Sequence, residues 1–172
     1  MKHKSENLII KSAPAMRSLG AKLAHAWQAN GDCVPLVIYL QGNLGSGKTT
    51  LTRGFLHALG YKEKIKSPTF TIVESYDLNG KNVYHFDLYR LKDPSELEYI
   101  GIRDYLHNGV LLIEWPECAP DNIPAADLIC SIKYDLKKPR ERNITLCAKS
   151  SSGTKILNTL DQKIHLKKSG SS

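Results

Sequence analysis

The chain has 172 residues, a length typical of one domain built around one hydrophobic core. Hydrophobic residues make up 41% and charged residues 24%, an ordinary globular composition with no apolar run long enough to cross a membrane. We therefore expect no membrane association and a cytoplasmic location, since the N-terminus also lacks the apolar stretch of a secretory signal. The formal net charge of +7 favours negatively charged ligands or partners.

Apolar periodicity predicts two helices and a strand in the first part of the chain. Residues 13–30 carry apolar side chains at helical spacing, and Gly31 is a plausible end. Residues 35–40 form a short apolar run, which is typical of a strand covered on both faces. After a glycine-rich loop, residues 51–59 mark one face of a second helix that Gly60 can end.

The middle of the chain contains a predicted hairpin. Strand-like runs at residues 70–76 and 83–89 flank Asn79-Gly80, a pair of residues that favours a tight turn between antiparallel strands. Residues 93–96 (Asp-Pro-Ser-Glu) combine an N-cap, a proline and an acid, so a helix is expected to start there.

Three further strands complete the prediction: a buried run at residues 110–113 and two runs at 127–134 and 143–148, joined by the basic turn 137–142. The fold class is therefore α/β, a single-domain P-loop NTPase fold with a mixed β-sheet of roughly six or seven strands flanked by helices. We expect residues 1–152 to form the P-loop ATPase domain and residues 153–172 to form a frayed basic C-terminal tail.

The glycine-rich loop carries the clearest chemical signal. Residues 42–49 read Gly-Asn-Leu-Gly-Ser-Gly-Lys-Thr, and a strand precedes them while an amphipathic helix follows. Glycines let successive backbone N–H groups point at phosphate oxygens, and the helix that begins at Lys48 adds the positive end of its dipole. Lys48 is expected to reach the β- and γ-phosphates, and the Thr49 hydroxyl to coordinate Mg²⁺. The predicted phosphate-binding residues are Asn43, Leu44, Gly45, Ser46, Gly47, Lys48, Thr49 and Thr50.

Two carboxylates stand at strand ends where they can serve the metal or an attacking water. Glu114 closes the apolar run 110–113, and Asp87 lies at the end of the predicted strand 83–89. Both are candidate catalytic residues, and Glu114 is a candidate Mg²⁺ ligand beside Thr49. From the residues alone, Glu114 can instead be an exposed strand end, and Asp87 can be a structural partner of Arg90.

Two neighbouring residues have open interpretations. Thr69 lies in a Ser-Pro-Thr loop and can sense the γ-phosphate as switch loops do, or it can belong to a simple turn into the next strand. Trp115 follows Glu114 and can contact the nucleotide or pack in the core.

Beyond the phosphate loop, four short motifs occur in a fixed order. They are Ser-Pro-Thr at residues 67–69, Tyr-His-Phe-Asp-Leu-Tyr-Arg at 84–90, Gly-Ile-Arg-Asp-Tyr at 101–105 and Ile-Glu-Trp-Pro at 113–116. With this set the chain, from about residue 13 to 150, strongly resembles the TsaE family, formerly YjeE, of bacterial P-loop ATPases. Two positions depart from the family pattern: Asn43 stands where many relatives have an acid, and Ala15-Met16 stands where they have a threonine-like residue.

The resemblance implies an ATP- and Mg²⁺-dependent ATPase of low turnover that supports formation of N6-threonylcarbamoyladenosine at A37 of tRNA. It implies the TsaB–TsaD pair as protein partners, TsaC in the same pathway, and indirect or weak contact with tRNA. It also implies Thr49 and Glu114 at Mg²⁺, Asp87 and Glu114 in hydrolysis, Thr69 in a switch-like loop, and Trp115 and Arg140 near the nucleotide.

Two other functions fit the same phosphate loop. A small-molecule kinase uses this loop too, and the basic segment 137–142 can be imagined as its lid, although no acceptor pocket is evident in the sequence. The second of these functions is a nucleotide-gated binding module, in which hydrolysis is incidental. Phosphate release without an added acceptor distinguishes the ATPase from the kinase.

Overall fold

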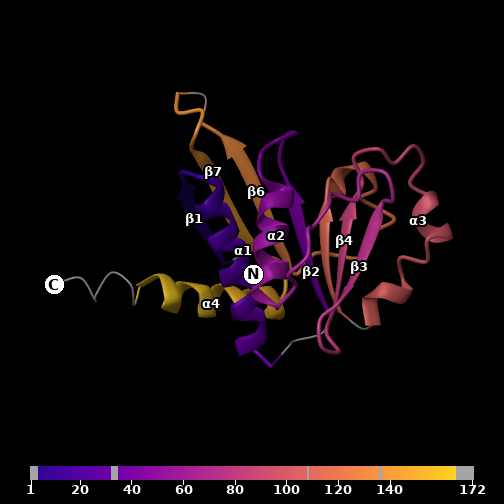
Figure 1. Cartoon of the computed structure of the whole chain (residues 1–172), viewed down its shortest axis with the longest axis horizontal. Coiled ribbons are helices and arrows are strands. Elements are labelled where there is room, and N and C mark those ends of the chain that lie inside the picture. The colour runs from indigo at the N-terminus through magenta and orange to yellow at the C-terminus, as the bar shows by residue number, and fades with distance from the viewer. Residues whose placement is uncertain (1–3, 32–34, 108, 136, 166–172) are drawn as a thin grey trace.

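The structure is a computed structural model that describes residues 4–31, 35–107, 109–135 and 137–165. Within these residues the chain forms one seven-stranded sheet and the helices packed against it (Figure 1). The strands are β1 (Ser5–Ile10), β2 (Leu36–Gln41), β3 (Val73–Asp77), β4 (Asn82–Asp87), β5 (Gly109–Glu114), β6 (Leu128–Tyr134) and β7 (Arg142–Ala148). The helices are α1 (Ala13–Ala29), α2 (Lys48–Ala58), α3 (Glu96–Tyr99) and α4 (Ser151–His165), with short 3-10 turns η1 (Asp104–His107) and η2 (Pro116–Cys118).

The sheet has the strand order β1-β7-β6-β2-β5-β4-β3. The central strand β2 pairs in parallel with β5 and β6, and β4 pairs in parallel with β5. The remaining pairs, β3 with β4, β6 with β7 and β7 with β1, are antiparallel. This confirms the predicted α/β fold with a mixed sheet. Because β2, β4 and β5 run in the same direction, the loop after β2, Asp87 and Glu114 all lie at one edge of the sheet.

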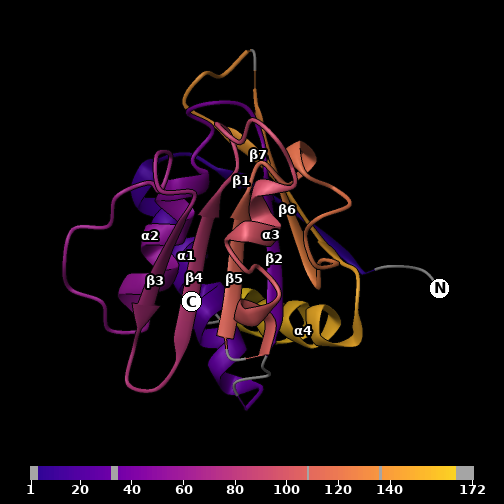
Figure 2. The same cartoon turned by 90° about the vertical axis from the view of Figure 1, so that its right-hand side faces the viewer.

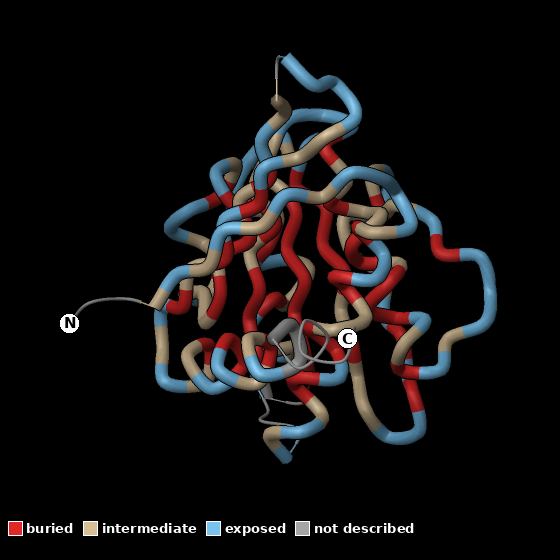
Figure 3. The backbone as a smooth tube through the Cα atoms, turned by 90° about the vertical axis from the view of Figure 1, so that its left-hand side faces the viewer, coloured by how far each residue is buried: buried red, intermediate tan, exposed pale blue. Residues whose placement is uncertain are grey.

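Both faces of the sheet are covered, and the buried strands lie in the middle of the molecule (Figure 3). Helices α1, α2 and α4 pack on one face and share a core with residues such as Ile38, Leu112 and Leu146. The opposite face of β2, β4 and β5 is covered by the segments around α3 and η2, which bury Leu97 and Ala119 (Figure 2). Within the described residues, no helix combines the length and apolarity needed to span a bilayer.

Helices α1 and α2 are in almost direct backbone contact. A Cβ added at Gly20 would lie 2.0 Å from the Leu51 carbonyl oxygen, and one added at Gly54 would lie 2.0 Å from the Arg17 carbonyl oxygen. Because real Cβ atoms do not approach that closely, only glycine fits at either position. The two glycines therefore fix the distance between α1 and the helix that follows the phosphate loop.

The two ends of the fold differ from the prediction. Strand β1 was not predicted; it is an edge strand whose side chains are only half-buried on one face. The prediction of a frayed tail from residue 153 is wrong for residues 153–165. These residues belong to α4, which buries Ile156, Leu157 and Leu160 against the core. The Lys4 ammonium donates to Asn158 Oδ1 at 2.8 Å and pairs with Asp161, which joins β1 to α4. Residues 166–172 lie outside the described residues.

Smaller differences lie in the middle of the chain. The strand predicted at 70–76 begins only at Val73, because the Ile72 amide bonds back to the Pro68 carbonyl oxygen at 2.8 Å and closes a turn. The helix expected from residue 93 begins at Glu96, whose carboxylate accepts from the Asp93 amide at 2.9 Å. The predicted hairpin around Asn79-Gly80 is confirmed as β3 and β4.

Candidate nucleotide-binding site

The loop between β2 and α2 has the backbone conformation that phosphate binding requires. Gly42, Gly45 and Gly47 have φ angles of 144°, 73° and 115°, a region that favours glycine. A Cβ at Gly42 would lie 2.5 Å from the Ile132 carbonyl oxygen, so the loop is also held close to β6. Helix α2 begins at Lys48 without a side-chain cap, and its first amide groups are available to an anion.

Lys48 lies against its own loop. Its ammonium donates to the carbonyl oxygens of Gly42 at 2.6 Å and Asn43 at 3.2 Å. The side chain is buried, and this burial lowers the pKa of Lys48 while the nearby carboxylate of Glu114 opposes the shift. The ammonium also lies 3.9 Å from the centroid of the Trp115 ring. Lys48 is therefore held at the loop by polar contacts that a phosphate oxygen can replace.

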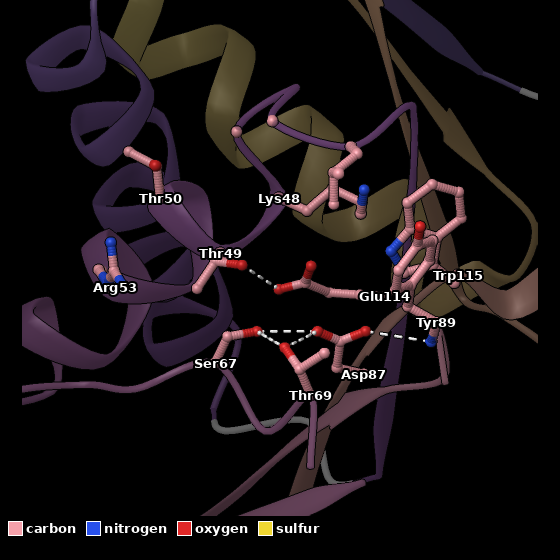
Figure 4. Close-up of a pocket in the computed structure, with 13 residues that line it drawn as sticks. Lys48, Thr49, Thr50, Arg53, Ser67, Thr69, Asp87, Tyr89, Glu114 and Trp115 are labelled. Atoms are coloured by element: carbon pink, nitrogen blue, oxygen red, sulfur yellow. Dashed lines mark hydrogen bonds between the residues drawn. The ribbon is translucent and has the colours of Figure 1, made fainter. Parts of the chain in front are cut away.

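Glu114 and Thr49, the two predicted Mg²⁺ ligands, are in direct contact. The Thr49 hydroxyl donates to Glu114 Oε1 at 2.8 Å, and Glu114 is only 2% exposed. The predicted alternative of an exposed strand end is therefore wrong. His85 Nε2 lies 2.8 Å from the same Oε1 atom, so one carboxylate oxygen has two partners. Figure 4 shows the Glu114 side chain extending across the pocket toward Thr49.

Asp87 holds the Ser-Pro-Thr loop. Its Oδ2 atom accepts from the hydroxyls of Ser67 at 2.8 Å and Thr69 at 3.0 Å, and its Oδ1 atom accepts from the Tyr89 amide at 3.1 Å (Figure 4). Arg90, the structural partner considered from the sequence, instead places its guanidinium 4.4 Å from the Phe70 ring centroid. Asp87 therefore ties Thr69 to the end of β4, next to Glu114.

Trp115 forms a wall of the site and is only partly buried. Its backbone is left-handed, with a φ of 59°, which is uncommon for a residue other than glycine. This conformation places the indole between Lys48 and Tyr89, whose ring centroid lies 4.9 Å away. A strained residue next to a candidate metal ligand is typical of a functional site.

These side chains surround a cavity of about 300 Å³. Its lining contains most of the residues predicted from the sequence and three that were missed: Arg53, Ser67 and Tyr89. The full lining is Leu44, Gly45, Gly47, Lys48, Thr49, Thr50, Arg53, Ser67, Thr69, Asp87, Tyr89, Glu114 and Trp115. Ser67 and Tyr89 belong to the motifs at residues 67–69 and 84–90, so these motifs could have identified them. Arg53 lies one helical turn after Thr49 on α2, and this spacing could have identified it.

A second cavity of about 130 Å³ lies on the other side of the phosphate loop. It is lined by Ile10, Ser12, Ala13, Met16, Gly45, Ser46, Gly47, Thr50, Arg140 and Arg142. Arg140 and Ser46, predicted near the nucleotide, are found here and not in the larger cavity. Asn43 lies in neither of these two cavities, and lines a third one of about 480 Å³ beside β6. Because the two cavities share Gly45, Gly47 and Thr50, a ligand can extend from one to the other around the loop.

A central strand, a glycine-rich turn and a helix that starts with lysine and threonine, beside a second parallel strand that ends in a carboxylate, are the defining parts of P-loop proteins, and the chain has this arrangement. Within that class the chain belongs to the TsaE family. Residues 10–144 match the family described as "Threonylcarbamoyl adenosine biosynthesis protein TsaE".

Curated relatives and a solved structure agree with this assignment. A Haemophilus influenzae protein named "tRNA threonylcarbamoyladenosine biosynthesis protein TsaE" is 49% identical over 123 residues, which cover 71% of this chain and 76% of the relative. A Bacillus subtilis protein of the same name is 40% identical over 126 residues, covering 73% and 76%. The crystal structure of Bacillus subtilis YdiB superposes with a TM-score of 0.76 at 28% identity and covers 95% of this chain and 98% of that one.

Proposed function

We propose that the protein is an ATPase of low turnover that binds ATP with Mg²⁺ and supports formation of N6-threonylcarbamoyladenosine at A37 of tRNA. Family membership and the names of the relatives supply the pathway. The observation that carries the ATPase part is the contact of Thr49 Oγ1 with Glu114 Oε1 at 2.8 Å, at the mouth of the phosphate loop. That contact brings together the hydroxyl and the carboxylate that P-loop enzymes use at their metal.

The donor atoms fit Mg²⁺. This ion prefers octahedral oxygen ligands at about 2.0–2.1 Å, so adjacent ligands lie about 2.9 Å apart. The separation of Thr49 Oγ1 and Glu114 Oε1 is 2.8 Å, close to that value. Among the described residues no group of three histidine, cysteine or acidic side chains is arranged to hold a metal ion, so the protein offers few ligands of its own. Phosphate oxygens and water complete the shell of such an ion.

The polar groups around the phosphate loop of the larger cavity have distinct roles in this proposal. The loop amides and Lys48 bind the phosphate chain, and Lys48 exchanges its bonds to Gly42 and Asn43 for phosphate oxygens. Mg²⁺, when bound, neutralises charge that develops on the phosphates. Glu114 and Asp87 orient the attacking water from the same edge of the sheet, and Asp87 also keeps Thr69 close to the γ-phosphate position.

The nucleoside part of ATP is assigned to the smaller cavity. Arg140 and the α1 residues Ala13 and Met16 line it, and it shares Gly45, Gly47 and Thr50 with the phosphate side. A ligand that spans the loop would place its phosphates beside Glu114 and its base and ribose beside Arg140. This proposal accounts for the position of Arg140 outside the larger cavity.

The TsaB–TsaD pair is the proposed protein partner, with TsaC in the same pathway and tRNA in indirect or weak contact. Two exposed apolar side chains, Leu44 (68% exposed) and Tyr89 (46%), line the phosphate side of the site, and exposed Phe70 (83%) follows the lining residue Thr69 in the chain. Exposed apolar groups gathered around a ligand site are typical of a surface that a partner covers. Binding there would make the partner sensitive to the nucleotide.

The decisive experiment compares the wild-type protein with Glu114→Ala. We expect the variant to keep most of its ATP affinity and to lose phosphate release, because Lys48 and the loop amides hold the phosphates without Glu114. Equal phosphate release by both proteins would remove Glu114 from the mechanism. Release that depends strictly on an added hydroxyl compound would identify a kinase instead.

The pathway is tested separately by a pull-down with purified TsaB and TsaD, with and without ATP. We expect ATP-dependent association. A protein that hydrolyses ATP but never associates with the pair would keep the ATPase assignment and lose the assigned partner.

A further inference from the structure

His85 is a buried polar residue to which the proposed mechanism gives no task. Its side chain is 0% exposed, and it lies in β4, two residues before Asp87. Side chains two residues apart in a strand point to the same face, so His85 and Asp87 share one face of β4. In the parallel pair with β5, Asp87 is the register partner of Glu114, and His85 is the partner of Leu112. The spacing His-x-Asp therefore places both side chains beside the Glu114 carboxylate.

The contacts of His85 point to one neighbour. Its Nε2 atom lies 2.8 Å from Glu114 Oε1, and a carboxylate oxygen accepts, so the ring fits as the tautomer with its hydrogen on Nε2. Its other nitrogen, Nδ1, is buried and has no partner within the described part of the chain. An unpaired buried nitrogen is unfavourable, and an apolar side chain of similar volume would avoid it. The polar contact that the ring makes is with Glu114.

Both donors to Glu114 meet the same oxygen. Thr49 Oγ1 and His85 Nε2 each lie 2.8 Å from Oε1 and approach it from different elements, α2 and β4. Among the described residues neither side chain bonds to Oε2. Two donors on one oxygen fix the rotation of the carboxylate, and a cation bound between Thr49 Oγ1 and Glu114 Oε1 would leave the His85 contact in place.

We infer that His85 is a positioning residue that holds the Glu114 carboxylate in the orientation required for the divalent cation. This inference rests on the proposed function and adds to it a residue that touches neither nucleotide nor metal. Partners that orient a metal-binding carboxylate affect metal affinity by about 10–100-fold when they are removed. His85 thus acts through Glu114 and determines how tightly the site binds Mg²⁺.

The test uses two substitutions that differ in one property. His85→Phe removes the donor and keeps an aromatic ring of similar volume, while His85→Gln places an amide N–H near the position of Nε2. The readout is Mn²⁺ binding to the full chain with saturating ADP, followed by electron paramagnetic resonance, and ADP affinity in EDTA. We expect the Mn²⁺ dissociation constant to rise about 10-fold in His85→Phe and to be largely restored in His85→Gln. ADP affinity in EDTA should be the same in all three proteins.

A double-mutant comparison separates positioning from a structural role. In a Glu114→Gln background, His85→Phe should have no further effect on Mn²⁺ binding, since the carboxylate it orients is absent. An equal loss in both backgrounds, or unchanged Mn²⁺ binding in a folded His85→Phe protein, would overturn the inference. So would loss of folding in both His85→Phe and His85→Leu, because His85 would then be a core residue. Absence of ADP binding by the wild-type protein would instead overturn the proposed function.

Discussion

The Lys48 ammonium lies 3.9 Å from the centroid of the Trp115 ring while it donates to two carbonyl oxygens of its own loop. The fluorescence emission of an indole ring changes when a cation that lies over the ring moves away. Since a bound phosphate competes for the Lys48 hydrogen bonds, nucleotide binding should displace the cation from the ring.

We therefore predict that ADP changes the fluorescence of Trp115. The chain has two tryptophans, and the Trp27→Phe variant leaves Trp115 as the remaining one. Titration of that variant with ADP should give a saturable change in emission. The same titration in a protein that also carries Lys48→Ala should show weakened binding, by more than about tenfold, because a charge-assisted contact is lost. Unchanged emission at saturating ADP, established by calorimetry, would contradict this prediction.

Thr69 should affect hydrolysis more than binding. Its hydroxyl and that of Ser67 both bond to Asp87, so Thr69→Val removes one of two ties that hold the loop and leaves the phosphate cradle intact. We expect hydrolysis to fall by about tenfold or more and ADP affinity to change little, the pattern of an interaction that matters in the transition state.

Hydrogen exchange supplies the structural measurement for the same variant. The Ile72 amide, which bonds to Pro68, should exchange faster in Thr69→Val. Thr71→Val is the matched control, because that hydroxyl bonds to Glu74 on the exposed side of the same loop. Equal exchange and equal rates in both variants would remove the Asp87 contact from the mechanism.

Gly20→Ala should destabilise the protein far more than a typical helix substitution does. The added methyl would lie 2.0 Å from the Leu51 carbonyl oxygen, so α1 and α2 must separate. Overpacking of this kind costs about 1–3 kcal/mol, although alanine has the better helix propensity. Ser18→Ala, on the exposed side of α1, is the control and should change the free energy of unfolding by less than about 0.5 kcal/mol. Urea denaturation measures both, and a neutral or stabilising Gly20→Ala would show that the helices can separate freely.

Stability should fall as the pH rises above 9. Burial raises the pKa of the Cys130 thiol from 9.0 to about 12. Because the unfolded thiol ionises first, the stability contributed by the neutral buried thiol is complete below pH 9 and is lost between pH 9 and 12, at no more than about 1.4 kcal/mol per pH unit. Tyr76, whose pKa is also raised to about 12, adds to the loss above pH 10. Cys130→Ala should flatten the curve of unfolding free energy against pH between pH 9 and 10, as measured by urea denaturation, and an unchanged slope would contradict the prediction.

The parts of the fold that the sequence predicts well are those with a strong periodic signal. The run 110–113 is apolar throughout because β5 is buried on both faces. Strand β1 escaped prediction because its burial alternates and its exposed positions include Ile9. Helix α4 has a clear apolar stripe, but its polar and basic composition resembles that of a frayed end.

For the candidate site, the residues that the sequence identifies are those that belong to a local pattern. Lys48 and Thr49 belong to the phosphate-loop motif, and Glu114 ends an apolar strand run, so two local patterns identify these residues. The hydrogen-bond partners of Asp87 could not be predicted from the sequence. Arg90 is close to Asp87 in the sequence and suggests an ion pair, whereas the tertiary fold brings the Ser67 and Thr69 hydroxyls to Asp87. The contact between His85 and Glu114 likewise depends on the register of β4 and β5, which no local sequence pattern specifies.

The position of β1 has a consequence for the order in which the protein becomes functional during synthesis. Its only sheet partner among the described strands is β7, with Ser5 opposite Cys147 and Ile10 opposite Arg142. Because a chain is synthesised from its N-terminus, β1 emerges from the ribosome before β7 and can pair with it only after β7 has followed. Ile10 and Arg142 also line the smaller cavity, so the wall assigned to the nucleoside is completed last. A nascent chain can thus form its phosphate loop early, yet it gains a complete ATP site only when β1 pairs with β7.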